Sequence, residues 1–142
     1  LDLFCGIGNF TLPLARFAAQ VVGVEAIEDM VSQGRLNTQR QGLDNVEFQT
    51  LDLTQQGLGE RIAQLEVNKL VLDPPRSGAR EVCEEMHQSG AQLLVYISCN
   101  PASLARDAAI LQAQNYKMVK FCVLDMFPHT AHVESMALFQ RQ

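Results

Sequence analysis

The sequence of 142 residues has no apolar run that approaches the roughly 20 residues needed to cross a bilayer. It also has no leader in which charged residues precede an apolar stretch. We therefore expect neither a membrane protein nor a secreted precursor. Apolar residues make up 47% and charged residues 19%, which is typical of a globular protein, and the length predicts a single domain over residues 1–142.

Cysteine is sparse, and Cys5, Cys83, Cys99 and Cys122 are far apart, with no Cys-x-x-Cys pair among them. This spacing argues against a zinc or iron–sulfur site within the chain and against a disulfide framework. We expect reduced thiols, a cytoplasmic location and no bound metal.

Positive charge is also scarce, because Lys plus Arg number 11 against 16 for Asp plus Glu, a net charge of −5. A domain that holds nucleic acid by bulk electrostatics needs clustered cations, so that class of protein is disfavoured. An enzyme that binds nucleic acid through another region remains open. The chain opens with the apolar Leu1–Phe4 and no initiator methionine, so we expect a domain of a longer protein.

The sequence does have a regular alternation of strand-like and helix-like segments. The predicted strands are residues 1–4, 21–24, 46–50, 70–72, 93–97, 118–124 and 135–139. The predicted helices are a stretch that ends at about residue 19, then residues 27–41, 57–65, 81–89 and 101–114. Strand–helix units followed by two strands with no helix between them predict an α/β fold. We expect a doubly wound, seven-stranded sheet, mostly parallel, with an antiparallel last strand.

Polar or glycine-rich residues follow each of the first five predicted strands. They are residues 6–9, Glu25, Asp52, Asp73 and residues 98–100. In an open α/β sheet, ligands bind outside the carboxyl ends of the strands. Turn preference alone would explain any one of these residues, but five in succession favour a binding site.

The first of these clusters favours an adenosyl cofactor. Gly6-Ile7-Gly8 lies between a strand and a helix, where bare backbone lets a ligand approach a helix N-terminus. Thr11 stands where the dinucleotide fingerprint has its third glycine, so a NAD dehydrogenase is a weaker alternative. Glu25 has the spacing of a carboxylate that binds ribose hydroxyls. Asp52 would contact the adenine edge or, alternatively, cap a helix.

The loop Asp73-Pro74-Pro75-Arg76 is more specific, because two prolines stiffen the backbone from which Asp73 projects. Enzymes that methylate exocyclic amines of bases carry a similar turn, followed by an aromatic residue that stacks on the flipped base. Arg76 stands in that place, which counts against amine chemistry.

Cys99 is the candidate nucleophile, because it lies between a strand end and a predicted helix. With Asn100 as the helix cap and Pro101 as the first helical residue, the free amides would stabilise a thiolate. A buried apolar role is the alternative. The other three cysteines lack this placement and are predicted to be packing residues.

The segment before the last strand contains His129 and His132, but no third metal ligand accompanies them. We expect structural or substrate-positioning roles for both histidines. Glu134 heads the last strand and could act as a general base, or it could be a solvated carboxylate.

Four motifs together resemble those of a known enzyme family. They are DLFCGIGNF at residues 2–10, DPPR at 73–76, SCNP at 98–101 and DMFPHTAHVES at 125–135. The family is that of the RNA uracil-5 methyltransferases, S-adenosylmethionine-dependent enzymes that make 5-methyluridine. Within this family, the motif sequences are most similar to those of the bacterial enzymes that act on 23S ribosomal RNA.

The resemblance implies that Cys99 is the nucleophile and that Glu134 is the base. We also count Asp73 among the candidate catalytic residues. The cofactor site that the resemblance implies, together with the glycine turn, consists of Phe4, Gly6, Gly8, Asn9, Glu25, Asp52 and Asp73.

It further implies a Rossmann-like methyltransferase fold, S-adenosylmethionine as cofactor and 23S ribosomal RNA as partner. An RNA-binding barrel and an iron–sulfur cluster are expected upstream of this chain. The alternatives are methylation of another RNA base, of a transfer-RNA uridine or of a protein side chain, and a catalytically silent module that binds S-adenosylmethionine or RNA.

Overall fold

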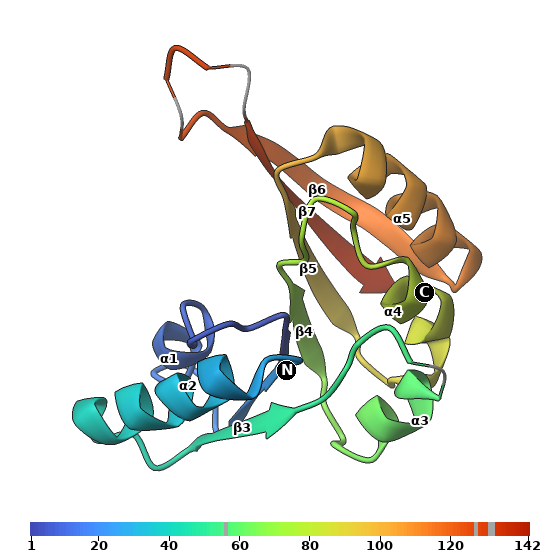
Figure 1. The fold of residues 1–142 in the computed structure, drawn as a ribbon. Coiled ribbons are helices and arrows are strands. Elements are labelled where there is room, and N and C mark those ends of the chain that lie inside the picture. Colours follow the sequence, from blue (N-terminus) through green and yellow to red (C-terminus); the bar gives the residue numbers. More distant parts are fainter. Residues whose placement is uncertain (56, 127, 131–132) are drawn as a thin grey trace. The chain divides into compact units, whose positions relative to one another are not determined.

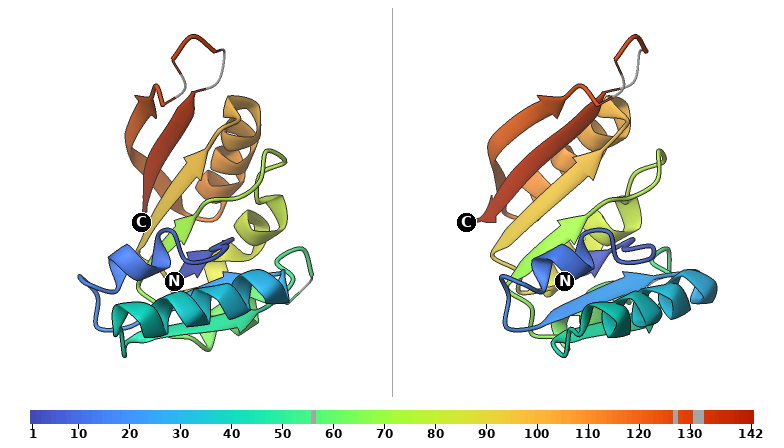
Figure 2. Two further views of the ribbon diagram at one scale, coloured as in Figure 1. Left: turned by 60° about the vertical axis from the view of Figure 1, so that its left-hand side comes forward. Right: turned by 90° about the vertical axis from the view of Figure 1, so that its left-hand side faces the viewer.

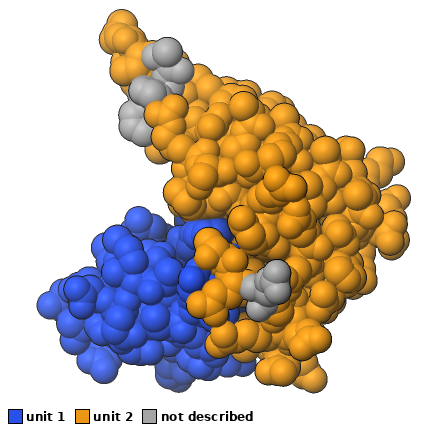
Figure 3. All heavy atoms as spheres, turned by 45° about the vertical axis from the view of Figure 1, so that its right-hand side comes forward, with its two compact units in different colours: residues 1–53 blue, residues 54–142 orange. Residues whose placement is uncertain are grey.

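The structure is a computed structural model that describes residues 1–55, 57–126, 128–130 and 133–142. The chain divides into two compact units, residues 1–53 and residues 54–142 (Figure 3). The single domain expected over residues 1–142 stays a prediction. None of the described helices has the length and apolarity that crossing a bilayer requires.

Unit 1, residues 1–53, is a small parallel sheet with two helices. Its elements are β1 (Asp2–Leu3), α1 (Thr11–Leu14), β2 (Val21–Glu25), α2 (Glu28–Gln41) and β3 (Val46–Thr50) (Figure 1). β2 pairs in parallel with both β1 and β3, which gives the strand order β3-β2-β1. α2 lies along β2 and β3 (Figure 2) and ends at Gly42, whose φ of 64° is the left-handed conformation expected of a helix stop.

The core of unit 1 is built around the ring of Phe48, a buried residue of β3. A Cβ atom on Gly34 would lie 2.5 Å from this ring, one on Gly8 would lie 2.8 Å from it, and one on Gly23 would lie 3.0 Å from it. Three glycines from different segments therefore leave the space that the ring fills. Tight packing of this kind is sensitive to single added methyl groups.

Helix α1 is shorter than predicted, because it ends at Leu14 rather than near residue 19. The amide of Phe17 donates to the carbonyl of Leu14, which is the pattern of a turn rather than of a continuing α-helix. The side-chain amide of Asn45 then donates to the carbonyls of Ala15 and Ala18, at 2.7 and 2.9 Å. These two carbonyls are hydrogen-bonded to Asn45 and not to later helical amides, so α1 ends at Leu14.

Unit 2, residues 54–142, combines parallel and antiparallel strands. Its elements are α3 (Leu58–Ala63), β4 (Lys69–Leu72), α4 (Arg80–Glu85), the 3₁₀ helix η1 (Met86–Gln88), β5 (Leu93–Ser98), α5 (Pro101–Ala113), β6 (Tyr116–Leu124) and β7 (Glu134–Arg141). β4 and β5 are parallel, whereas β7 runs antiparallel to both β5 and β6. The described residues of the two units contain seven strands, mostly parallel with an antiparallel last strand, so the predicted α/β class is confirmed.

The strands of unit 2 present two unlike faces. Leu72, Tyr96 and Ala137 are partners in register and fully buried, and Tyr96 is bonded to α5. The alternate positions Val71 and Val95 are partners on the other face and are only half-buried. Because side chains alternate along a strand, the residues on this second face can be followed to the ends of β4 and β5.

The packing of Phe48 generates a stability prediction. We expect Gly34→Ala to lower the free energy of unfolding by about 2 kcal/mol, because overpacking costs about 1–3 kcal/mol or more and outweighs the helix preference for alanine. Urea denaturation followed by circular dichroism measures the change. Gln39→Ala on the exposed side of the same helix is the control and should change stability by less than about 0.5 kcal/mol. Equal stability of the two variants would contradict the packing argument.

Candidate active site

The turn after β1 has an unusual backbone. Phe4, Gly6 and Gly8 all have positive φ angles, of 64°, 54° and 96°. Such a conformation is uncommon for phenylalanine and natural for glycine. At Gly8 a side chain would also meet the ring of Phe48, so both the backbone and the packing require glycine there. The turn therefore keeps its backbone free of side chains at two of the predicted cofactor positions.

Glu25, the last residue of β2, is locked to this turn. Its Oε2 accepts a hydrogen bond from the amide of Gly6 at 3.1 Å, and its Oε1 accepts from the amides of Ala26 and Ile27 at 2.8 and 3.2 Å. A carboxylate offers about four acceptor positions, so three backbone donors leave capacity for a ligand hydroxyl. Two predicted cofactor residues, Gly6 and Glu25, are thus brought together by a contact that the sequence does not reveal.

Two further predicted cofactor residues lie near the surface of unit 1. Asn9 is exposed and lines an open groove of about 640 Å³, together with Gly8 and residues of α1 and α2. Among the described residues, Asn9 and Gly8 are the predicted cofactor residues that line this groove. Asp52 is exposed and follows Thr50, the residue that pairs with Glu25, by two positions. Asp52 therefore lies beyond the end of β3, where the strand pattern predicts a ligand contact.

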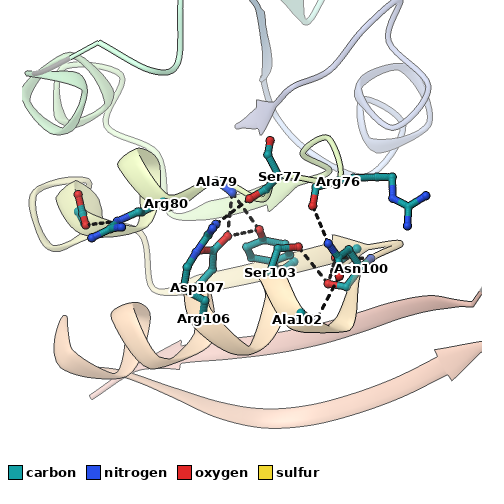
Figure 4. Close-up of polar contacts among 12 residues, drawn as sticks. Arg76, Ser77, Ala79, Arg80, Asn100, Ala102, Ser103, Arg106 and Asp107 are labelled. Atoms are coloured by element: carbon teal, nitrogen blue, oxygen red, sulfur yellow. Dashed lines mark hydrogen bonds and ion pairs between the residues drawn. The ribbon is translucent and has the colours of Figure 1, made fainter.

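In unit 2, Cys99 lies between two residues whose positions are fixed by hydrogen bonds. Asn100 caps α5, since its Oδ1 accepts from the amide of Ala102 at 3.1 Å (Figure 4), and Pro101 is the first helical residue. The hydroxyl of Ser98 donates to the carbonyl of Asn100 and accepts from its amide, both at 3.0 Å. The predicted cap is confirmed, and the half-buried Cys99 is held at the helix N-terminus.

The three predicted catalytic residues share one face of the unit 2 strands. Ile97 pairs with Met136 and Ser98 pairs with Ser135, so the antiparallel register continued by one residue sets Cys99 opposite Glu134. Asp73 follows β4 on the face of Val71, which is also the face of Val95 in the neighbouring strand. The thiol and the two carboxylates therefore come to one end of the face opposite α5.

The two carboxylates of this group affect each other. Asp73 is half-buried, and its removal from water raises the pKa of its carboxyl group, with the negative charge of Glu134 raising it further. Repulsion of this kind requires the two groups to be near each other. The electrostatics thus agree with the strand register, and they identify Asp73 as the carboxyl group that takes up a proton more readily than an exposed aspartate.

Arg76 and the histidines were singled out by the sequence without a firm role. The carbonyl of Arg76 accepts a hydrogen bond from the side-chain amide of Asn100 at 2.9 Å, while its exposed guanidinium points away from this contact (Figure 4). His129 is exposed and has a φ of 69°. His132 lies outside the described residues. Among the described residues, no three His, Cys, Asp or Glu side chains form a group that could hold a metal.

The remaining cysteines behave differently from one another. Cys5 is buried, and desolvation raises the pKa of its thiol to about 12, with the charges of Asp2 and Glu25 adding to the effect. Burial likewise raises the pKa of Cys83. The packing role predicted for these two is confirmed. For Cys122 it is wrong, because this residue is exposed on β6, an outer strand of the order β4-β5-β7-β6.

Two buried aspartates were missed by the sequence interpretation. Asp2 is fully buried in β1, and its Oδ2 accepts from the hydroxyl of Thr11 at 2.6 Å. Thr11 thus stands in place of a glycine because it satisfies a buried carboxylate. Asp107 is fully buried on α5 and is bonded to Tyr96. The signal available in the sequence was an acidic residue within an apolar strand for Asp2, whereas Asp107 gave none.

The whole chain is similar to proteins of one known enzyme family. The model of the family described as tRNA (Uracil-5-)-methyltransferase matches residues 1–142 of the chain. The chain belongs to this family. The similar curated members of the tRNA (uracil-5-)-methyltransferase family include the 23S rRNA (uracil(1939)-C(5))-methyltransferase RlmD of Hahella chejuensis, 57% identical over 99% of this chain, and that of Alkalilimnicola ehrlichii, 54% identical over 100%. The chain spans 32% of the length of each.

Solved structures agree with the family and the fold. The tRNA (uracil-54, C5)-methyltransferase of Pyrococcus abyssi, solved with S-adenosyl-L-homocysteine, has a TM-score of 0.80 and 29% identity, covering 97% of this chain and 33% of its own. The magnesium protoporphyrin IX methyltransferase of Synechocystis, at 18% identity and a TM-score of 0.72, covers 99% of this chain and 68% of its own and shares the fold. The family resemblance and the Rossmann-like methyltransferase fold predicted from the sequence are therefore confirmed.

The coupling of the two carboxylates generates a prediction for this member of the family. Glu134→Gln should lower the pKa of Asp73, because it removes the like charge, but burial should keep that pKa above the ordinary value of about 3.9. Carbon-detected NMR of the Asp73 carboxyl group as a function of pH measures it. Glu66→Gln is the control and should leave the Asp73 titration unchanged. A titration that is the same in wild type and Glu134→Gln would show that the two groups are not close.

Proposed function

We propose that this chain is the catalytic part of an S-adenosylmethionine-dependent enzyme that methylates carbon 5 of a uridine in 23S ribosomal RNA. The observation that carries the proposal is the group formed by Cys99, Asp73 and Glu134 on one face of the unit 2 strands. The relatives named as 23S ribosomal RNA enzymes support the substrate. Because the chain spans 32% of their length, the activity of the whole protein is part of the proposal.

Unit 1 has the chemistry to bind the cofactor. Glu25 retains acceptor capacity for the ribose hydroxyls, and the turn at Gly6 and Gly8 offers backbone without side chains. We assign cofactor binding to Phe4, Asn9 and Asp52 of unit 1 as well, and also to Asp73. S-adenosylmethionine, when bound, supplies the methyl group as an electrophile. The presence of S-adenosyl-L-homocysteine in the Pyrococcus abyssi relative supports this assignment.

The proposed chemistry begins at the thiol of Cys99. Its thiolate forms a bond to C6 of uracil, and the electrons of the C5–C6 double bond move onto the ring as an enolate. C5 becomes nucleophilic and would take the methyl group as the bond from methyl to sulfur breaks, which leaves S-adenosyl-L-homocysteine. Glu134 then removes the proton from C5, the ring returns to the enolate, and the thiolate leaves C6 as the double bond forms again. A uridine in a loop suits this route, because it must leave the base stack to reach the protein.

Asp73 is proposed to act beside Glu134 at the reacting base. Its raised pKa lets it keep a proton to higher pH than an exposed aspartate, so it can donate a hydrogen bond to a carbonyl oxygen of the base as well as accept one. The four cysteines carry free thiols, which fits the cytoplasmic location that we assign to the protein.

A transfer-RNA uridine is the second candidate substrate, because the Pyrococcus abyssi relative acts on one. Its 29% identity is lower than the 57% shared with the ribosomal enzyme of Hahella chejuensis, so we favour ribosomal RNA. Assays of the full-length protein on both RNAs distinguish the two candidates.

The nucleophile can be tested directly. Cys99→Ala should leave S-adenosylmethionine binding intact and lower methyl transfer by about a thousandfold or more, because no adduct can form at C6. With RNA that contains 5-fluorouridine, wild-type protein should stall as a covalent methylated complex, since fluorine at C5 cannot leave as a proton. Mass spectrometry of the cross-linked peptide identifies the attachment site.

The matched control is Cys122→Ala, which removes an exposed thiol from β6, a strand that does not pair with β5, and should behave as wild type. Wild-type turnover by Cys99→Ala would eliminate Cys99 from the reaction. If wild type forms no adduct although it binds the cofactor, the chain is better described as a binding module or as an amine methylase.

The base is tested by its own variant. Glu134→Gln should still methylate C5 but should release the product slowly, because the C5 proton stays in place and the thiolate cannot leave. We expect an RNA–protein adduct to accumulate with unmodified RNA on denaturing gels. Normal turnover without any adduct would refute the assignment of Glu134.

A further inference from the structure

Asp107 on α5 is fully buried, and the proposed reaction does not use it. Its Oδ2 accepts from the hydroxyl of Tyr96 at 2.5 Å and from the amide of Ala79 at 2.7 Å. Its Oδ1 accepts from Nε of Arg106 at 2.8 Å and lies 2.7 Å from Nη2 of the same side chain. A carboxylate removed from water is costly unless it is paired and hydrogen-bonded, and this one is satisfied on both oxygens.

One donor to Asp107, the amide of Ala79, comes from the loop that follows Asp73. The amide of Ala79 is shared between Asp107 and the hydroxyl of Tyr96, at 2.7 and 3.1 Å. Nη2 of Arg106, the arginine paired with Asp107, also donates to the carbonyl of Ser77 at 2.8 Å. The loop is therefore attached to α5 through its own backbone rather than through side chains that could be exchanged (Figure 4).

Gly78 allows this close approach. Its φ is 85°, and a Cβ atom there would lie 2.4 Å from Oδ2 of Asp107 and 2.5 Å from Nη2 of Arg106. A side chain at this position would displace the Asp107 carboxylate or the Arg106 guanidinium, and the positive φ also disfavours one. The same loop is also held at the start of α5, where the side-chain amide of Asn100 donates to the carbonyl of Arg76.

These contacts connect the two segments that carry the reacting groups. The loop begins directly after Asp73, and α5 begins directly after Cys99 and Asn100. We propose that Asp107, with Tyr96 and Arg106, forms a positioning group that sets Asp73 and Cys99 at their working separation. This inference rests on the proposed function, because it assumes that these two residues act together.

The charge of Asp107 is essential to this role. A carboxylate is an acceptor at both oxygens, and here it meets the Tyr96 hydroxyl, the Ala79 amide and the Arg106 guanidinium. An asparagine would turn an NH₂ group toward one set of these donors. Asp107→Asn is therefore expected to disturb the loop strongly, so a loss of activity in this variant would not distinguish unfolding from a change in catalysis. Tyr96→Phe is the milder variant, because it removes one hydroxyl and keeps the buried ring.

The chain supplies a matched control in Tyr116. This tyrosine is also buried, and its hydroxyl donates to the carbonyl of Ala91 at 2.6 Å. It pairs with Arg141, at the opposite end of β7 from Glu134. Tyr96→Phe and Tyr116→Phe each remove one hydroxyl from a buried hydrogen bond, so a purely structural role predicts similar losses of stability and no difference in catalysis.

The experiment compares the two variants in the full-length protein, at a temperature well below both unfolding transitions. We expect Tyr96→Phe to lower kcat by about 10- to 100-fold with little change in the KM for RNA, because misplacement of about 1 Å costs rates of this order. Formation of the 5-fluorouridine adduct should slow by the same factor. Tyr116→Phe should keep the wild-type kcat. Equal kcat values for the two variants would overturn the positioning role.

A second measurement separates this inference from the proposed function. The rate at which iodoacetamide alkylates Cys99, followed by peptide mass spectrometry with Cys122 as the internal reference, requires no RNA and no cofactor. We expect it to change in Tyr96→Phe and not in Tyr116→Phe. If wild type forms no adduct, the proposed function is wrong, and the alkylation rates alone then test whether the Asp107 group positions Cys99. Identical rates of Cys99 alkylation in both variants would refute that positioning role.

Discussion

The antiparallel pairing of β7 with β5 is the constraint on which the proposed catalytic part of this molecule depends. If β7 ran parallel to β5, its first residue, Glu134, would lie at the opposite end of the sheet from Cys99, which follows the last residue of β5. With β7 reversed, its first residue comes beside the last residues of β5, as the pairing of Ser98 with Ser135 shows. The cap of α5 by Asn100 then fixes where Cys99 lies along that end. Register and cap together turn distant sequence positions into neighbours.

Carboxylates that accept backbone amides recur as the means by which loops are fixed. Glu25 accepts from the amides of Gly6, Ala26 and Ile27, and so holds the turn after β1 to the end of β2. Asp107 accepts from the amide of Ala79 and holds the loop after β4 to α5. In both places the donor is backbone, so the contact constrains the path of the chain and not merely one side chain. Hydrogen bonds to a charged acceptor are also stronger than those between neutral groups.

Most of the fold could be predicted from the sequence, because the strands are short apolar runs with turn residues at their ends. β3 was predicted with its observed limits, and the cap at Asn100 followed from the proline after it. The end of α1 was not, because it depends on the side chain of Asn45, which lies far along the chain. The exposure of Cys122 was missed for a related reason, since the position of β6 in the sheet is set by pairing and not by its own apolar residues.

The candidate site divides in the same way. Local motifs were sufficient to propose Cys99, Asp73 and Glu134, because the residues next to them in the sequence indicate loops and strand ends. Asp107 could not, because an aspartate within a helix normally reads as a solvated residue, and its partners Ala79 and Tyr96 come from other elements. A buried charge adds little to stability compared with apolar packing, so its value is better sought in geometry. A carboxylate that accepts from three separate donors, one of them a backbone amide of the loop, restricts the path of that loop, and the proposed positioning of Asp73 and Cys99 requires such a restriction.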